Sequence, residues 1–509
     1  MRGGGWWAPG SVPPFPEVFA NPGECWKKDP LDDRPIVDMP GRRIRTAMKG
    51  EPAPPRETAP LPLRISPEGD RRLQELFRSR TVPEPVQRLV EEYIARKTGK
   101  PWDDPTVQER IRTAIRAQKG EYWREGAGRR ISYRAGYRVM AYLAYHFPVV
   151  FFQTLLLFDD LARAGPIPAH LRVLDVGTGP GVVPLALTEW YRQAGAGSLE
   201  VTSIEPSLEH REAFQALVPS FARGMPGIRV GDPLPLDIRE VQVTDLPGPF
   251  DLIVFSNVLN EIPDLTDQER AGIVRRVGDR LAAGGRILLA EPADLANSTM
   301  LRRIVAILGR EGLHIRAPCA FPWGGSCPGT ECWTFREEPP IRPTRLMAWI
   351  GQGAESYRYL NTDLKYSYAV LDRGGGTGPA HRLRAGPDIL RLSRLGRKEG
   401  RRVSVAAALM SGDLGNRDYH LYKICDGTAV KPVYAVVPAH RRALAGRLAR
   451  ARYGTLAVFR EVLVRRNPAH DAFNLLVDRR AEVEFFPADS GARARPHRRG
   501  KEEDGSRRV

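Results

Sequence analysis

The sequence predicts an α/β protein in which a helical domain precedes a central parallel sheet and a smaller, mainly β domain follows it. Three observations support this fold class. Apolar residues recur at helical spacing early in the chain, short apolar runs alternate with helical stretches in the middle, and β-like segments follow residue 339. The chain has 509 residues, 42% hydrophobic and 27% charged, which excludes collagen, coiled coil and wholesale disorder.

Five segments are expected along the chain. Residues 1–65 are dense in Pro and Gly and should form a flexible arm, and residues 489–509 a disordered charged tail. Between them we predict a helical domain over 66–165, an α/β domain over 166–338 and a basic, mainly β domain over 339–488.

The first helical signals are Leu73, Leu76 and Phe77. The most apolar stretch, residues 139–158, is long enough to cross a bilayer, but His146 and Pro148 interrupt it, so we expect two short buried helices and no membrane partner. The amino-terminal residues lack a basic segment followed by an unbroken apolar one, which predicts no secretory signal and a reducing compartment.

The middle of the chain alternates strands with helices, the pattern of a parallel sheet. The expected strands are Leu171–Val176, Val201–Ile204, Val241–Val243, Leu252–Phe255 and Arg286–Ala290, with helices at Val182–Tyr191, Leu208–Leu217 and Glu269–Leu281. A helix near 298–312 and a strand near 332–337 should follow. The β domain should contain Tyr366–Leu371, Val403–Leu409, His420–Ile424, Val433–Val437 and Val483–Phe486, and a basic helix over Arg441–Arg452.

A glycine-rich loop follows the first predicted strand and opens a helix. It reads Asp175-Val176-Gly177-Thr178-Gly179-Pro180-Gly181. Glycines allow a sharp turn and close approach of a ligand, and a helix amino terminus favours a negative group. Glu205 ends the second strand and Asp245 precedes the fourth. A dinucleotide-binding loop is the alternative, although its glycine spacing and its acid about 20 residues on fit less well.

These features resemble the S-adenosylmethionine site of Rossmann-like methyltransferases. The resemblance implies that Asp175, Gly177, Gly179 and Gly181 pack against the methionine part, that Glu205 takes the ribose hydroxyls, and that Asp245 accepts from the adenine amino group. After the fourth strand, residues 256–261 lack both the prolines of amino-methylating enzymes and a Pro-Cys nucleophile. Asn257, Asn260 and Glu261 could cap a helix and line the pocket, so no catalytic residue is predicted.

Four of the five cysteines form a constellation. Cys319, Cys327 and Cys332 lie within fourteen residues of a Gly- and Pro-rich loop, Cys425 lies in the β domain, and Cys25 belongs to the arm. Thiolates are ligands for zinc or for iron-sulfur clusters, and this spacing leaves both open. Unrelated buried thiols are the alternative.

Several motifs, in order over about residues 70–440, resemble the methyltransferase-like family of mitochondrial small-ribosomal-subunit proteins and assembly factors and their bacterial relatives. They are LDVGTGPG, SNVLNEIPD, GGRILLAEP, the APC–CP–C run and KYSY. The resemblance implies a [4Fe-4S] cluster on Cys319, Cys327, Cys332 and Cys425, and binding to rRNA of the small ribosomal subunit during its maturation. It also implies a location in the bacterial cytoplasm, or in the mitochondrial matrix of a eukaryote.

The net charge of +17 lies outside the centre of the chain, because residues 171–295 carry 11 basic and 18 acidic residues. Basic segments at 124–138, 381–402 and 441–452 are candidate RNA-binding surfaces, and solvated arginine faces are the alternative. We therefore expect an iron-sulfur, methyltransferase-fold protein, monomeric when free, that assists small-subunit maturation. The alternatives are an active S-adenosylmethionine-dependent rRNA methyltransferase and a small-molecule methyltransferase with structural zinc.

Overall fold

The structure is a computed structural model that describes residues 61–122, 136–262, 264–324, 327, 332–353, 355–374 and 389–486. The predicted tail, nearly all of the predicted arm, most of the basic segment at 124–138 and residues 381–388 of the basic segment at 381–402 lie outside the described residues.

Five helices form the amino-terminal part of the described chain. They are α1 (Pro67–Ser79), α2 (Glu84–Thr98), α3 (Pro105–Tyr122), α4 (Tyr137–Tyr145) and α5 (Phe147–Ala164). The Ser66 hydroxyl caps α1 by accepting from Gly69 N at 3.1 Å, as expected for Ser at this position.

The long apolar stretch is broken, as predicted, into α4 and α5. Most residues of both helices are buried, because they pack against the central sheet and its helices. Within the described residues no single helix is long and apolar enough to cross a membrane; α4 and α5 reach that length only together, with a bend of 51° between them.

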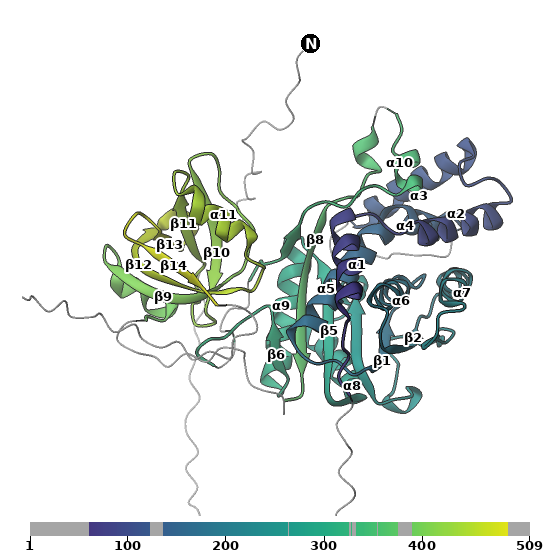
Figure 1. Cartoon of the computed structure of the whole chain (residues 1–509), viewed down its shortest axis with the longest axis horizontal. Helices are drawn as coiled ribbons and strands as arrows, with labels where there is room; N and C mark the ends of the chain where they lie inside the picture. Colours follow the sequence, from purple (N-terminus) through teal and green to yellow (C-terminus); the bar gives the residue numbers. More distant parts are fainter. Residues whose placement is uncertain are drawn as a thin grey trace, which may run out of the picture. The chain divides into compact units, whose positions relative to one another are not determined.

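The central sheet has the strand order β3-β2-β1-β4-β5-β8-β6, and β7 pairs with β8. Figure 1 shows this sheet with β1, β2, β5, β6 and β8 labelled. Its parallel strands are β1 (His170–Val176), β2 (Ser198–Ile204), β3 (Ile228–Val230), β4 (Phe250–Ser256) and β5 (Leu281–Pro292). The antiparallel strands are β6 (His314–Ala317), β7 (Arg336–Glu338) and β8 (Leu364–Asp372). The connecting helices are α6 (Val182–Ala194), α7 (Leu208–Ala222), α8 (Asp267–Gly278) and α9 (Leu295–Arg310), with the short α10 (Arg345–Ile350) before β8.

The third strand was predicted wrongly. Residues 241–243 are not a strand: they lead into a 3₁₀ turn, η2 (Val243–Asp245), which the Asp245 carboxylate closes by accepting from Gln242 N at 2.7 Å. The edge strand is instead β3, only three residues long, and its pairing with β2 outweighs its weak local signal. The strand β8 lies beyond the boundary predicted at residue 339 and yet pairs with β5, so the central sheet extends past that residue.

The carboxyl-terminal strands form a second, barrel-like sheet. Its strands are β9 (Arg402–Leu409), β10 (Tyr419–Cys425), β11 (Val433–Pro438), β12 (Leu456–Asn467), β13 (Ala472–Leu476) and β14 (Glu482–Phe485), in the order β13-β11-β10-β9-β12-β14. A further pairing of β12 with β13 closes five strands into a ring. The helix α11 (Arg442–Arg450) connects β11 to β12, and its Leu444 and Leu448 are buried in the barrel core.

Candidate cofactor site and cysteine site

The glycine-rich loop lies between β1 and α6 at the carboxyl edge of the sheet, where ligands bind in open α/β folds. Gly177, Gly179 and Gly181 all have positive φ, between 55° and 89°, a conformation that glycine adopts without strain. An added Cβ at Gly177 would meet Val258 Cγ2 at 2.5 Å, and one at Gly181 would meet Val218 Cγ2 at 2.3 Å. These glycines are therefore required both by the turn and by the close approach of neighbouring elements.

Glu205, at the end of β2, holds this loop. Its Oε2 accepts from Gly179 N at 2.9 Å, its Oε1 accepts from Ser207 N at 2.8 Å, and His210 Nδ1 lies 3.7 Å from Oε1. Burial alone would raise the pKa of Glu205, but the hydrogen bond and charge of His210 and the two backbone donors outweigh burial, so the pKa is lowered. Glu205 is thus an anchored, ionised acceptor beside the loop.

Several buried polar atoms meet at the same edge of the sheet without hydrogen-bond partners among the described residues. They are Asp175 Oδ2, Thr178 Oγ1, Ser203 Oγ, Ser256 Oγ, both amide atoms of Asn260 and Glu291 Oε2. They come from the ends of β1, β2, β4 and β5 and from the loops that follow these strands. Because buried polar groups in folded proteins are nearly always paired, this concentration indicates a place for a polar ligand.

Two carboxyl groups at this edge have pKa values raised to near neutral pH. Burial, reinforced by the charge of Glu205, raises the pKa of Asp175 to about 7. Burial also raises the pKa of Glu291 to about 8, although its Oε1 accepts from Leu259 N at 3.0 Å. Both groups can therefore change charge when a cationic ligand arrives.

Two of the predicted cofactor residues do not present a side chain to the unpartnered buried atoms: Asp245 lies apart from them, and Asn257 acts through its backbone. Asp245 is exposed and its carboxylate closes its own turn, so its predicted adenine contact stays a prediction. Asn257 has φ 54° and donates its N–H to Ala290 O at 2.8 Å, which fixes the turn after β4. The predicted residues Asn260 and Glu261 follow in a 3₁₀ turn, η3 (Leu259–Glu261).

Sequence reasoning missed several side chains of this site, among them Ser203, Ser256, Glu291, Tyr142 and His210. Tyr142 on α4 lies near three acids: burial, and then the charges of Glu261, Asp175 and Glu205, raise its pKa. The Tyr142 ring lies 6.0 Å from the ring of His210, the partner of Glu205. The helical domain therefore contributes a wall of the site, which no local pattern of the sequence indicates.

The cysteine segment of the α/β domain interlocks with the barrel. Trp323 Nε1 donates to Asp426 Oδ2 at 2.8 Å, and an added Cβ at Gly427 would lie 2.4 Å from the Phe321 ring. The residues two after Cys319 and two after Cys425 thus touch each other. Farther along, Thr334 Oγ1 donates to Met410 O at 2.6 Å and Lys423 Nζ to Trp333 O at 2.8 Å.

The four predicted ligands are brought into one neighbourhood. Burial, and then the nearby thiols, raise the pKa of Cys425, and Cys319, Cys332 and Cys327 all contribute. Burial likewise raises the pKa of Cys319 to about 12, and Cys332 and Cys327 again reinforce it. Within the described residues, however, no three His, Cys, Asp or Glu side chains are set to hold one metal ion.

A buried cation beside these thiols fits an anionic group there. Arg302 is 5% exposed, and its Nη2 donates to Ser367 Oγ and Tyr368 O. Its Nε and Nη1 have no hydrogen-bond partner among the described residues. Burial opposes its charge, but Tyr453, Cys319, Cys332 and Tyr368 outweigh burial and raise its pKa. The guanidinium of Arg302 thus lies beside these thiols with two of its nitrogens unpaired among the described residues.

The comparisons with known proteins agree with this fold. A family model described as "Methyltransferase domain" matches residues 152–337, and the model "Domain of unknown function (DUF8157) C-terminal domain" matches residues 393–486. No curated protein matches the chain. With the sheet order and the glycine-rich loop, the first match shows that the α/β domain has the Rossmann-like fold of S-adenosylmethionine-dependent methyltransferases.

Solved structures with similarity include a S-adenosylmethionine-dependent methyltransferase from Clostridium acetobutylicum (15% identity, 28% of this chain, 50% of that chain, TM-score 0.21). The chain thus spans about half the length of that protein. Others are coclaurine N-methyltransferase (11% identity, 59% and 98%, TM-score 0.28) and magnesium protoporphyrin IX methyltransferase from Synechocystis (11% identity, 53% and 100%, TM-score 0.28).

Proposed function

We propose that this protein is an S-adenosylmethionine-dependent methyltransferase. The observation that carries the proposal is the convergence of unpartnered buried polar atoms on the glycine-rich loop, beside the anchored carboxylate of Glu205. The match to a methyltransferase domain over residues 152–337 supports it. The active enzyme, an alternative in the sequence analysis, is thereby favoured over a protein that has kept only the fold.

The residues of the chain would hold the cofactor by its polar ends. Glu205 can accept from the two ribose hydroxyls, and Asp175 can face the cationic methionine part at the opposite end of the loop. When bound, the cofactor supplies a methyl group on a positively charged sulfur. Asn260 and Glu291 lie behind the turn after β4, where an acceptor would approach, and their unpaired amide and carboxyl atoms could orient it.

For the acceptor we propose RNA of the small ribosomal subunit. The family resemblance of the sequence motifs suggests it, and the basic carboxyl-terminal domain supports it. Residues 389–486 contain 19 Lys and Arg against nine Asp and Glu. Phosphate-rich partners favour such an excess of base.

We also propose that Cys319, Cys327, Cys332 and Cys425 hold a [4Fe-4S] cluster. Such a centre would tie the α/β domain to the barrel, since metal binding contributes directly to folding energy. The interlocked Phe321 and Gly427, together with the uncompensated charge of Arg302, support this placement. Zinc is the alternative metal for the same thiols.

Two measurements test the enzymatic proposal. Calorimetric titration with S-adenosylmethionine should show one site, and tritium-methyl transfer to immature small subunits should label RNA. Absence of binding would refute the cofactor assignment. Binding without any labelling would refute RNA as the acceptor and favour a small-molecule substrate.

Anaerobic purification with iron, zinc and sulfide analysis tests the metal centre separately, because stoichiometric zinc without sulfide would exclude the cluster.

A further inference from the structure

The barrel has a connectivity that indicates what it binds. If β9 to β13 are numbered 1 to 5 in chain order, neighbouring strands around the closed barrel follow the order 1-2-3-5-4-1. The third and fifth strands are parallel, and α11 lies between the third and the fourth. This is the connectivity of the OB-fold, a five-stranded Greek-key barrel whose second and third strands and the loop between strands four and five bind oligonucleotides and oligosaccharides.

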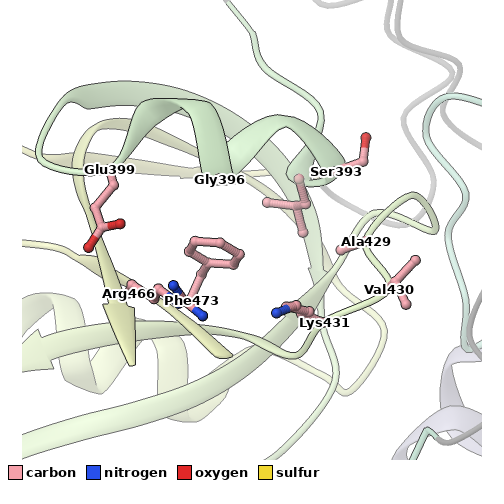
Figure 2. A pocket seen from close by; sticks show the side chains of 9 residues that line it. Ser393, Gly396, Glu399, Ala429, Val430, Lys431, Arg466 and Phe473 are labelled. Atoms are coloured by element: carbon pink, nitrogen blue, oxygen red, sulfur yellow. The ribbon is translucent and has the colours of Figure 1, made fainter. Parts of the chain in front are cut away.

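A hollow of about 450 Å³ lies beside the ends of the two strands, β12 and β13, that this loop connects. It is bounded by the 3₁₀ segment η5 (Leu392–Lys398), the loop between β10 and β11, and the adjoining ends of β12 and β13. Figure 2 shows the ring of Phe473 in the middle of this hollow, below η5, with Arg466 and Lys431 at its edge. Neither this hollow nor a second one of about 570 Å³ beside β2 and β3 contains a predicted cofactor residue.

The lining combines an aromatic face with cations. Phe473 packs only partly against the barrel core, and Val430 at the rim is 77% exposed. Arg466 is exposed, and its side chain forms no ion pair or hydrogen bond with the described residues, whereas Lys431 pairs with Asp471 at 2.5 Å. Glu399 contributes a single carboxylate from the end of η5. Bases stack on an aromatic ring whatever their sequence, phosphates bind to guanidinium groups, and a carboxylate accepts from base amino groups.

The charge of the barrel selects between the ligands of this fold. Its net charge over residues 389–486 is +10, more than half of the +17 of the whole chain. Neutral oligosaccharides gain nothing from such a charge, whereas a polynucleotide releases counterions when it binds to it. From the closed barrel, the aromatic hollow and this charge, we infer that the hollow around Phe473 and Arg466 binds single-stranded RNA, with one base on Phe473 and a phosphate on Arg466. The choice of RNA rests on the proposed RNA acceptor.

Fluorescence anisotropy of the full chain with a labelled single-stranded RNA of about 12 nucleotides tests the site. We expect Phe473→Leu, which keeps an apolar side chain in the core, to weaken binding by about tenfold, since base–aromatic stacking is lost. Arg466→Gln should weaken binding and lower the slope of log K against log salt by about 0.7, the value for one phosphate contact on a single strand. Arg465→Gln is the matched control, because it removes the same charge from the neighbouring residue of β12, which does not line the hollow.

Equal losses in Arg466→Gln and Arg465→Gln would overturn the inference, because diffuse charge would then explain the binding. It would also be overturned by tighter binding of duplex RNA, or of DNA of the same sequence, than of single-stranded RNA. Phe473→Leu and Arg466→Gln should leave S-adenosylmethionine affinity unchanged, so failure of RNA binding and failure of the cofactor site are separate results. Methyl transfer without binding in the hollow would remove this inference alone.

Discussion

Glu205→Gln is the substitution that tests the cofactor site most directly. The carboxylate accepts two backbone N–H groups, from Gly179 and Ser207, and is 6% exposed. An amide has only one acceptor oxygen, so one of these buried donors would face the new NH₂ group and lose its partner. Leaving a buried donor unsatisfied costs about 1–3 kcal/mol.

The Gly179 N–H belongs to the loop that would contact the cofactor, and Glu205 itself would lose an acceptor for the ribose. We therefore expect the loss to appear as weaker binding of S-adenosylmethionine. At about 1.4 kcal/mol per factor of ten, Kd should rise by about fivefold to about 150-fold. Calorimetric titration measures this, and circular dichroism checks that the variant is folded.

The matched control is Glu200→Gln, within β2 near the end opposite Glu205; Glu200 is half-exposed and pairs with His170 at 3.5 Å. This variant should bind the cofactor like the wild type. A change in Kd of less than about twofold for Glu205→Gln in a folded protein would refute the reasoning, because the site could not then depend on this carboxylate.

Two further predictions concern the buried Asp175 and the thiols. Burial raises the pKa of Asp175 from 3.8 to about 7. The contribution of Asp175 to the stability of the apo-protein is therefore complete below about pH 3.8 and is lost as the pH rises from there to about 7. Thermal unfolding against pH should show this loss in the wild type and not in Asp175→Asn, and affinity for the cationic cofactor should rise over the same range only in the wild type. Cys425→Ser should lower the iron and sulfide bound per chain, whereas Cys25→Ser should not; equal metal content in both variants would exclude Cys425 as a ligand.

Much of the fold could be predicted from local patterns. The strands β1, β2 and β4 are short apolar runs followed by helical spacing, and the break in the apolar stretch at His146 gives α4 and α5. The edge strand β3 could not be predicted, because three residues carry no periodicity and only pairing with β2 defines them. Likewise β13 was missed, because it is only five residues long and its pairing with β11, a strand that is not its neighbour in the sequence, leaves no local pattern.

The site was predictable where backbone geometry required a residue type. The positive φ angles of Gly177, Gly179 and Gly181 leave a signature in the sequence. Tyr142 leaves none, because its place beside Asp175 follows from how α4 packs on the sheet. The sequence showed four cysteines as a constellation, but their assignment as ligands of one centre came from the family resemblance, since contacts across 92 intervening residues have no local pattern.

The contact between the cysteine segment and the barrel can be tested by comparing two glycines, Gly427 and Gly400, that share one backbone conformation. Gly427 has φ +77°, and a Cβ there would lie 2.4 Å from Phe321 Cδ1; Gly400 has φ +74° and nothing within 4 Å of its Cβ. Alanine at either position carries the same left-handed strain of about 1–2 kcal/mol. Only at Gly427 must the Phe321 ring, and with it the segment of Cys319, move away from Cys425.

The free energy of unfolding of Gly427→Ala should therefore be about 1–3 kcal/mol lower than that of Gly400→Ala, which is the usual penalty for overpacking. It should also bind less iron per chain, since the displacement separates two proposed ligands. Denaturant unfolding and metal analysis of both variants measure the two effects. If both variants unfolded alike and carried equal iron, the Phe321–Gly427 contact would not set the position of the thiols. If only stability fell, the contact would hold the domains together without positioning a metal centre.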